Sequence, residues 1–241
     1  MKTKTKQDQA FEFVIAASLV SSMITILIAV YPPKAAADLY LQRQLIGTVF
    51  AAICVCGAIA ALYPQKCVVT SEAHPFQPVR KSDLKNRPAL SIKGHHPDCG
   101  EFQAHTLHFG GAVYCAACSG LFAGAVVSLA ATAVFFFLGV NIGELSLPAV
   151  VVGQAGVLIG LVEFEFKGWF RSLANVFFVL GGCLILIGID QRVHSLFIDV
   201  FVVGALLLWI FARIVLSQWD HSRTCARCEF SCRIDGRGQV V

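Results

Sequence analysis

Six long apolar windows constrain this sequence more than any other feature. A helix needs about 20 apolar residues to cross the roughly 30 Å hydrocarbon layer of a bilayer, and a helix satisfies its own backbone hydrogen bonds there. The fourth and fifth windows are the shortest and leave little room for tilt. We expect transmembrane helices near Phe11–Tyr31, Leu45–Tyr63, Ala112–Val140, Leu147–Glu163, Leu173–Ile189 and Ser195–Ser217.

The composition agrees with an all-α integral membrane protein of about six spans. Hydrophobic residues make up 56% of the chain and charged residues 14%, whereas soluble proteins average about 25% charged residues. The excess of basic over acidic residues, 19 against 15, is modest. Membrane topology explains it better than a nucleic-acid partner does, so the lipid bilayer is the expected surrounding and nucleic acid is not an expected partner.

The distribution of lysine and arginine predicts the orientation. If the amino terminus is cytoplasmic, all 19 basic residues fall on the cytoplasmic side except Lys34, Arg43 and Arg192. Positively charged loops stay in the cytoplasm, so we expect both termini inside and an even number of spans. The prediction is a multi-pass protein of the cell membrane.

This topology divides the chain into four parts. Residues 1–64 hold the first two spans, 65–111 form a cytoplasmic loop, 112–217 hold four further spans and 218–241 form a cytoplasmic tail. The loop and the tail both face the reducing side of the membrane, where disulfides are rare. Cysteines that cluster there need another reason to cluster.

The stretch Gly94–Gly124 is the strongest candidate for chemistry. It carries four of the seven histidines and three of the ten cysteines just before and at the entry to the third apolar window. Imidazole and thiolate groups are the ligands of zinc and other borderline metals. The candidate ligands in this stretch are His96, Cys99, His105, His108, Cys115 and Cys118.

The tail carries a second group of candidate ligands, His221, Cys225, Cys228 and Cys232. Two CxxC pairs on the same side of a membrane can supply the four thiolates of a closed tetrahedral zinc site. The alternative is two local sites, one in the loop and one in the tail. The concentration of ligands around His96, Cys99 and His105 slightly favours a local first site.

Zinc is the first choice of metal, and an iron–sulfur cluster is the alternative, because both use several cysteine ligands. No HExxH helix is present, and neither CxxC is followed by the histidine of a haem-attachment motif. Glu101, Glu163 and Glu165 are candidate general bases beside an open metal position. Charged residues at a span end are more often interfacial anchors, so enzymatic activity stays open.

Residues 115–124, CAACSGLFAG, resemble the DUF2085-type family of multi-pass membrane proteins of unknown function. The family pattern has a Cys-His start, a Phe and then Cys-x-x-Cys-(Thr/Ser)-Gly-(Ile/Leu)-(Tyr/Phe)-x-Gly. Phe102 matches the middle, while His95-His96 stands at the Cys-His start and Ala117 stands where Arg is common. Cys99 is a substitute for the missing first cysteine. The resemblance covers about thirty residues and implies a polytopic fold with a Cys/His site.

Three functions fit these observations. The first is a non-enzymatic platform in which a cytoplasmic zinc site ties the loop, the third span and the tail together for a protein or lipid partner. The second is a membrane redox component with an iron–sulfur centre or reactive thiols. The third is a metal-linked transporter or sensor, for which Gln154 and Asn175 within spans are candidates to form interhelical hydrogen bonds or to line a path. We favour the first.

Overall fold

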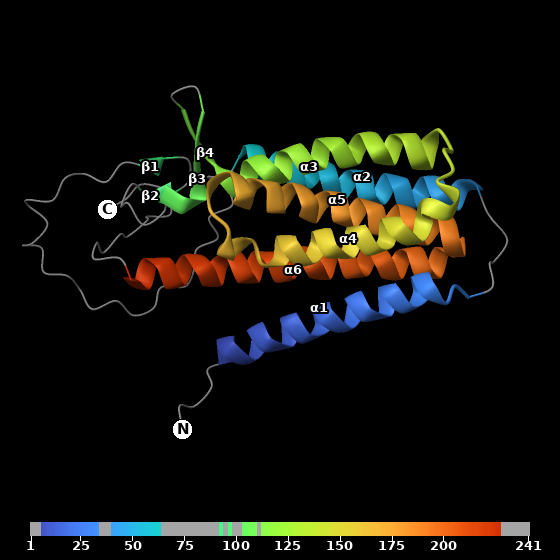
Figure 1. Cartoon of the computed structure of the whole chain (residues 1–241), viewed down its shortest axis with the longest axis horizontal. Helices are drawn as coiled ribbons and strands as arrows, with labels where there is room; N and C mark the ends of the chain where they lie inside the picture. The colour runs from blue at the N-terminus through green and yellow to red at the C-terminus, as the bar shows by residue number, and fades with distance from the viewer. Residues whose placement is uncertain are drawn as a thin grey trace, which may run out of the picture.

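The computed structural model describes residues 6–33, 40–63, 92–93, 96–97, 103–109 and 112–227. Six of its helices are long and apolar enough to cross a membrane, and they run alternately in opposite directions along one axis (Figure 1). The start of the first helix and the end of the last therefore lie at the same end of the bundle. The predicted all-α membrane fold with six spans is confirmed.

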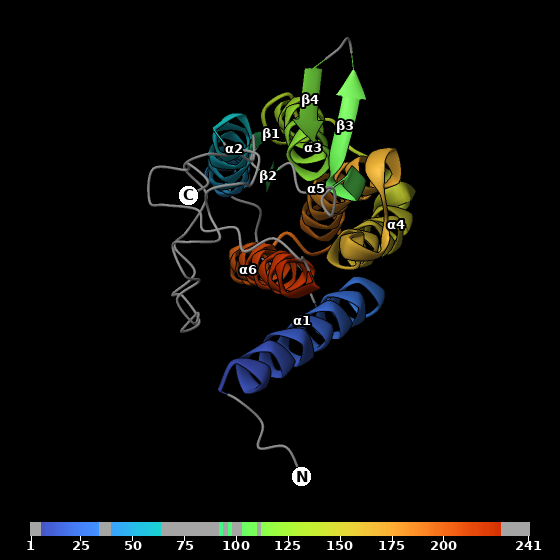
Figure 2. The same cartoon turned by 90° about the vertical axis from the view of Figure 1, so that its left-hand side faces the viewer.

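The spans are α1 (Lys6–Val30), α2 (Tyr40–Leu62), α3 (Ala116–Thr132), α4 (Ser146–Leu161), α5 (Gly168–Val193) and α6 (Leu196–Arg227). Short helical turns connect or extend them at η2 (Gln103–His105), η3 (Ala133–Phe137), η4 (Gly143–Leu145) and η5 (Glu163–Glu165). Two small antiparallel ribbons pair β1 (Ile92–Lys93) with β2 (His96–Pro97) and β3 (Thr106–Phe109) with β4 (Ala112–Cys115); the second is seen lengthwise in Figure 2.

Helix α5 is the central helix of the bundle. Within its candidate span 67% of the residues are buried, against 22 to 39% in the other five. Glycines let α4 approach it closely: a Cβ atom on Gly153 would lie 2.6 Å from the carbonyl oxygen of Gly181, and one on Gly156 would lie 2.6 Å from that of Phe177. Small residues at helix contacts are the usual way for membrane helices to pack, because lipid supplies no hydrophobic drive between them.

Helix α1 packs on α6 through small polar residues. The indole N–H of Trp209, which is fully buried, donates to the carbonyl oxygen of Ser18 at 3.2 Å and to the hydroxyl of Ser21 at 3.0 Å. Thr25 continues the same buried face and bonds within its own helix to the Ser21 carbonyl at 2.8 Å. Interhelical hydrogen bonds of this kind hold membrane helices in register.

Three predicted boundaries are wrong. The third span was expected from Ala112, but Ala112–Cys115 forms strand β4 and the helix begins at Ala116. The fifth span is not short, since α5 has 26 residues. The last helix continues past Ser217 to Arg227, so the beginning of the tail is helical. In the last two cases charged residues at the helix ends were read as the start of loops.

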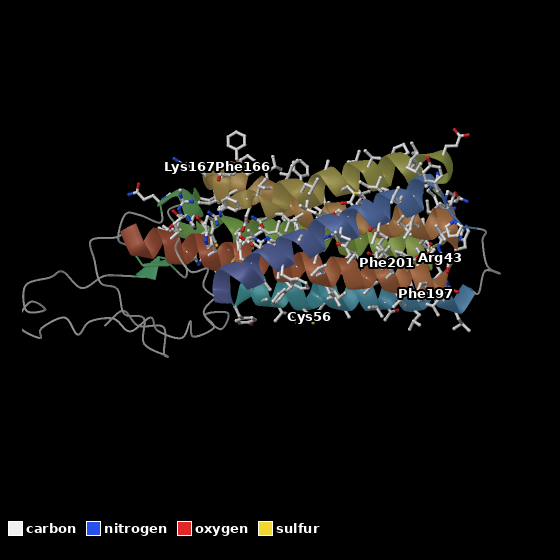
Figure 3. All side chains as sticks on the ribbon, turned by 90° about the horizontal axis from the view of Figure 1, so that it is seen from below. Arg43, Cys56, Phe166, Lys167, Phe197 and Phe201 are labelled. Atoms are coloured by element: carbon white, nitrogen blue, oxygen red, sulfur yellow. The ribbon has the colours of Figure 1, made fainter. Side chains whose placement is uncertain are left out.

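The two ends of the bundle differ in their polar contacts. At the end where α2 begins, Arg43 pairs with Asp190, with 3.1 Å between Nε and Oδ2, and its guanidinium lies 4.0 Å from the centre of the Phe135 ring. Figure 3 places Arg43 at this end and Phe166 and Lys167 at the other. We call the second end, where α5 begins and α6 finishes, the network end.

Candidate functional site at the network end

A cluster of charged and polar side chains is buried at the network end. Glu163 and Arg171 are each only 2% exposed, Asn175 is fully buried and Arg213 is 8% exposed. Charges in such places are costly unless they are paired and hydrogen-bonded. We call this cluster, with the partners at its edge, the ionic network; its members are His105, Glu163, Arg171, Asn175, Arg213 and Asp220.

Glu163 is directed inward by the turn that follows α4. The helix ends at Leu161, and Val162 leaves the helical conformation with φ −96° and ψ 21°. The single turn η5 then buries Glu163 and exposes Glu165 two residues later. Gly168, with φ +51°, turns the chain into α5, a conformation that a glycine adopts without steric cost.

The inner part of the network neutralises Glu163. Its Oε2 accepts a hydrogen bond from Nη2 of Arg213 at 2.8 Å, and the side-chain amide of Asn175 also donates to it. Asn175 in turn accepts from Arg213 through its amide oxygen and donates to the carbonyl oxygen of Arg171 at 2.7 Å. The carboxylate thus faces two donors from two different helices.

Arg171 joins this inner part to the outer one. Its Nη2 lies 3.8 Å from Oε1 of Glu163 and donates to Oδ2 of Asp220 at 3.2 Å. Its Nη1 lies 3.2 Å from Nε2 of His105. A guanidinium only donates hydrogen bonds, so Nε2 is the acceptor and the ring proton of a neutral His105 sits on Nδ1. Arg171 therefore fastens the loop before β3 to the last helix.

Beside Arg171, one predicted metal ligand from the loop meets one from the tail. The rings of His105, from the loop group, and His221, from the tail group, lie with their centres 5.5 Å apart at an angle of 37°. Because α6 is helical to Arg227, Cys225 follows His221 by about one turn on the same helix. Of the described residues, His105 of the loop and His221 of the tail therefore lie at one place.

The first CxxC pair lies beside this place. Cys115 is the last residue of β4 and the N-cap of α3, and its Sγ accepts a hydrogen bond from the backbone N–H of Cys118 at 3.5 Å. Cys115 pairs across the ribbon with Thr106, the residue after His105. The positive end of a helix and a backbone amide donor both favour a thiolate. The prediction that the pair stands at the entry to the third span is confirmed.

The remaining predicted ligands are only partly described. His108 is exposed on β3, His96 lies in β2, and Cys225 is on α6. Cys99, Cys228 and Cys232 lie outside the described residues. Among the side chains that the structure does describe, no three His, Cys, Asp or Glu residues are grouped closely enough to hold a metal ion.

Two of the described ligands fit a zinc site. Cys115 and Cys118 present sulfur atoms from the first turn of one helix, which supplies half of a tetrahedral set. His105 fits less well, because its Nε2 faces Arg171. A complete tetrahedral zinc site would need two further ligands.

The ionic network itself was not predicted. Glu163 was considered as an interfacial anchor or a general base, and Asn175 as a source of interhelical hydrogen bonds, which it does form. Arg171 and Arg213 were used only to orient the spans. The available signal was the spacing of Arg171 and Asn175, four residues apart on one face of α5 beside an apolar window.

No family model, curated protein or solved structure matches the chain. The resemblance of residues 115–124 to the DUF2085-type family therefore stays a prediction. Function has to be argued from the site.

Proposed function

We propose that this protein is a non-enzymatic membrane platform whose cytoplasmic end is held together by one structural zinc ion shared between loop and tail. The observation that carries the proposal is the convergence at Arg171, which binds His105 from the loop and Asp220 from the last helix. His221 lies next to Asp220 in sequence and against the His105 ring. Cys115, which pairs with Thr106 beside His105, and Cys225, one helical turn after His221, are thus carried by elements that lead to this contact.

The proposed ligands are Cys115 and Cys118 from α3 together with Cys225 and Cys228 from the tail. Cys115 ends β4 opposite Thr106, the residue after His105, and the second pair begins about one turn beyond His221. Four thiolates form a closed and redox-silent zinc site. Bound there, zinc would cross-link the third and sixth spans where they leave the membrane.

The geometry supports a structural role better than a hydrolytic one. A general base needs a carboxylate that can take a proton from water. Glu163 is instead 2% exposed and is held by Arg213 and Asn175, while Glu165 points away from the network on the exposed side of η5. Glu101, the third candidate base, lies outside the described residues.

The cytoplasmic orientation and the cell-membrane location rest on the charge distribution. All basic residues except Lys34, Arg43 and Arg192 fall on the side of the network end, and basic loops are retained in the cytoplasm. Thiols on that side stay reduced, which is the state that zinc requires. The proposal includes membership of the DUF2085-type family, because the family pattern contains the same CxxC, Cys115 to Cys118.

The test is the metal content of the full chain, purified in detergent without chelators or an affinity metal. We expect about one zinc per chain and no visible absorption. Cys115→Ser with Cys118→Ser should remove the zinc, and so should Cys225→Ser with Cys228→Ser. The matched control is Cys56→Ser, since Cys56 is an exposed cysteine inside the apolar α2 span.

Three results would overturn parts of this proposal. Zinc retained after loss of the tail pair would place the site locally, with Cys99 and His96 or His108 as further ligands. Bound iron with broad visible absorption would make the protein an iron–sulfur redox component. A chain that carries no metal in any preparation would leave the thiols without a shared ligand and would defeat the platform as described.

A further inference from the structure

The hairpin formed by β3 and β4 has one apolar face that extends beyond the bundle. Directly paired residues of an antiparallel ribbon share a face, and so do residues two apart along a strand. The pairs Leu107–Tyr114 and Phe109–Ala112 therefore lie on one face. Leu107 is buried at 5% exposure, whereas Phe109 is 71% and Tyr114 51% exposed.

The other face of the hairpin is more polar. It carries Thr106, His108, Val113 and Cys115; His108, towards the tip, is exposed, and Cys115, where the ribbon joins α3, is buried. The ribbon is thus amphipathic, with an aromatic side and a side that suits water. An isolated two-stranded ribbon is not stable by itself, so contact with its surroundings must support it.

The position of the hairpin shows what its aromatic face meets. The ribbon projects sideways from the network end, across the direction of the helices, and is seen edge-on in Figure 1 and face-on in Figure 2. Since the helices cross the membrane along their axes, the ribbon lies parallel to the membrane plane, near the level where α3 begins. Strand β3 contacts α5, and the buried Leu107 marks the face that is turned to the bundle. That face is the aromatic one.

Further aromatic side chains lie at the same level. Trp169 and Phe170, in the first turn of α5, are 63% and 73% exposed, and Lys167 precedes them. Tryptophan and tyrosine gather where the bilayer meets water, because their rings are apolar and their polar atoms reach the headgroups. We call Phe109, Tyr114, Trp169 and Phe170 the aromatic collar.

We propose that the β3–β4 hairpin is an interfacial membrane anchor whose aromatic face, carried by Phe109 and Tyr114, lies in the lipid headgroup layer. The occupant is the lipid surface because the collar continues the lipid-facing surface of the spans at the depth where they end. This proposal does not depend on the metal, so it stands or falls separately from the zinc site.

The test compares tryptophans placed on the two faces of the hairpin. Phe109→Trp and His108→Trp put the probe on adjacent residues with opposite orientations. Both are made in the full chain with Trp169→Phe and Trp219→Phe, which leaves the fully buried Trp209 as an internal reference. The proteins are reconstituted in phosphatidylcholine vesicles with bromine atoms at a shallow or a deep acyl position, and the emission of the parent background is subtracted.

For Phe109→Trp we expect the fluorescence of the introduced tryptophan, after subtraction of the background, to fall at least twofold in vesicles brominated at the shallow position. The loss should be smaller in vesicles brominated at the deep position. For His108→Trp we expect little quenching. Tyr114→Trp, on the same face as Phe109, repeats the test if Phe109→Trp does not fold. Equal quenching on both faces, or none at Phe109 and Tyr114, would overturn the anchor. Protection of those two positions that appears only at high protein density would assign the face to a second copy of the chain instead.

Discussion

Replacing Glu163 by glutamine removes one charge from the ionic network with almost no change in shape. Glu163 lies 2.8 Å from Arg213 and 3.8 Å from Arg171 and is 2% exposed. After Glu163→Gln, the network keeps two buried guanidinium groups but only one carboxylate, Asp220, which pairs with Arg171. Two charges about 4 Å apart interact by roughly 4 kcal/mol at an effective dielectric constant of 20. Breaking a buried ion pair typically costs about 3–5 kcal/mol.

We therefore expect Glu163→Gln to lower the free energy of unfolding by about 3 kcal/mol. That is roughly a hundredfold change in the unfolding equilibrium constant. The measurement is reversible unfolding by dodecyl sulfate in mixed micelles, followed by circular dichroism. Glu165→Gln is the matched control, because Glu165 belongs to the same turn and is exposed. It should change stability by less than about 0.5 kcal/mol.

A second variant separates the charge effect from a loss of packing. Glu163→Leu combined with Arg213→Met removes both members of the closest pair and leaves Arg171 balanced by Asp220. Apolar replacement of a whole buried pair is often neutral or stabilising, so the double variant should be more stable than Glu163→Gln. If Glu163→Gln costs no more than Glu165→Gln, the network is not a buried charge balance and this reasoning is wrong.

Two further changes test the packing of the network end. Gly120→Ala should lower the free energy of unfolding by about 1–3 kcal/mol in the same assay, because the new Cβ would clash with the Ser172 carbonyl. The control is Gly57→Ala, whose Cβ meets nothing within 4 Å and should leave stability unchanged. Equal effects of the two substitutions would contradict the close contact at Gly120. Arg171→Lys keeps the positive charge but loses the two guanidinium nitrogens that contact His105 of the loop and Asp220 of α6 at the same time. We expect faster amide hydrogen exchange in residues 103–115 and unchanged exchange in α4, whereas an unchanged hairpin would show that other contacts hold it.

The sequence predicted the membrane architecture because the physics of the bilayer is simple. A span must be apolar and long, and each of the six windows satisfied this within a few residues of the observed helix. Boundaries failed where charged residues continue a helix. Arg171 and Arg192 lie inside α5, where both form hydrogen bonds to other helices. Helix α6 runs on to Arg227, beyond the apolar window. Hydropathy alone cannot register a partner that is distant in sequence.

The candidate site was predicted in part for a related reason. Cys115 and Cys118 could be placed because a CxxC at the start of an apolar helix is a local pattern. The contact of His105 with Arg171 joins residues 66 positions apart, and that of Arg171 with Asp220 joins residues 49 apart. Periodicity and spacing carry no information on such contacts. Only the fold shows that His105 and His221 meet.

Helix α5 shows how the two ends of the bundle depend on each other. It carries Arg171 near its start and Asp190 near its end, and each is paired with a residue of opposite charge from another helix, Asp220 or Arg43. A helix that is paired at both ends cannot slide along its axis or rotate without separating a buried pair. The close glycine contacts with α4 restrict it further. Any sliding of α5 relative to α6 would therefore have to separate Arg171 from Asp220 and Asn175 from Arg213.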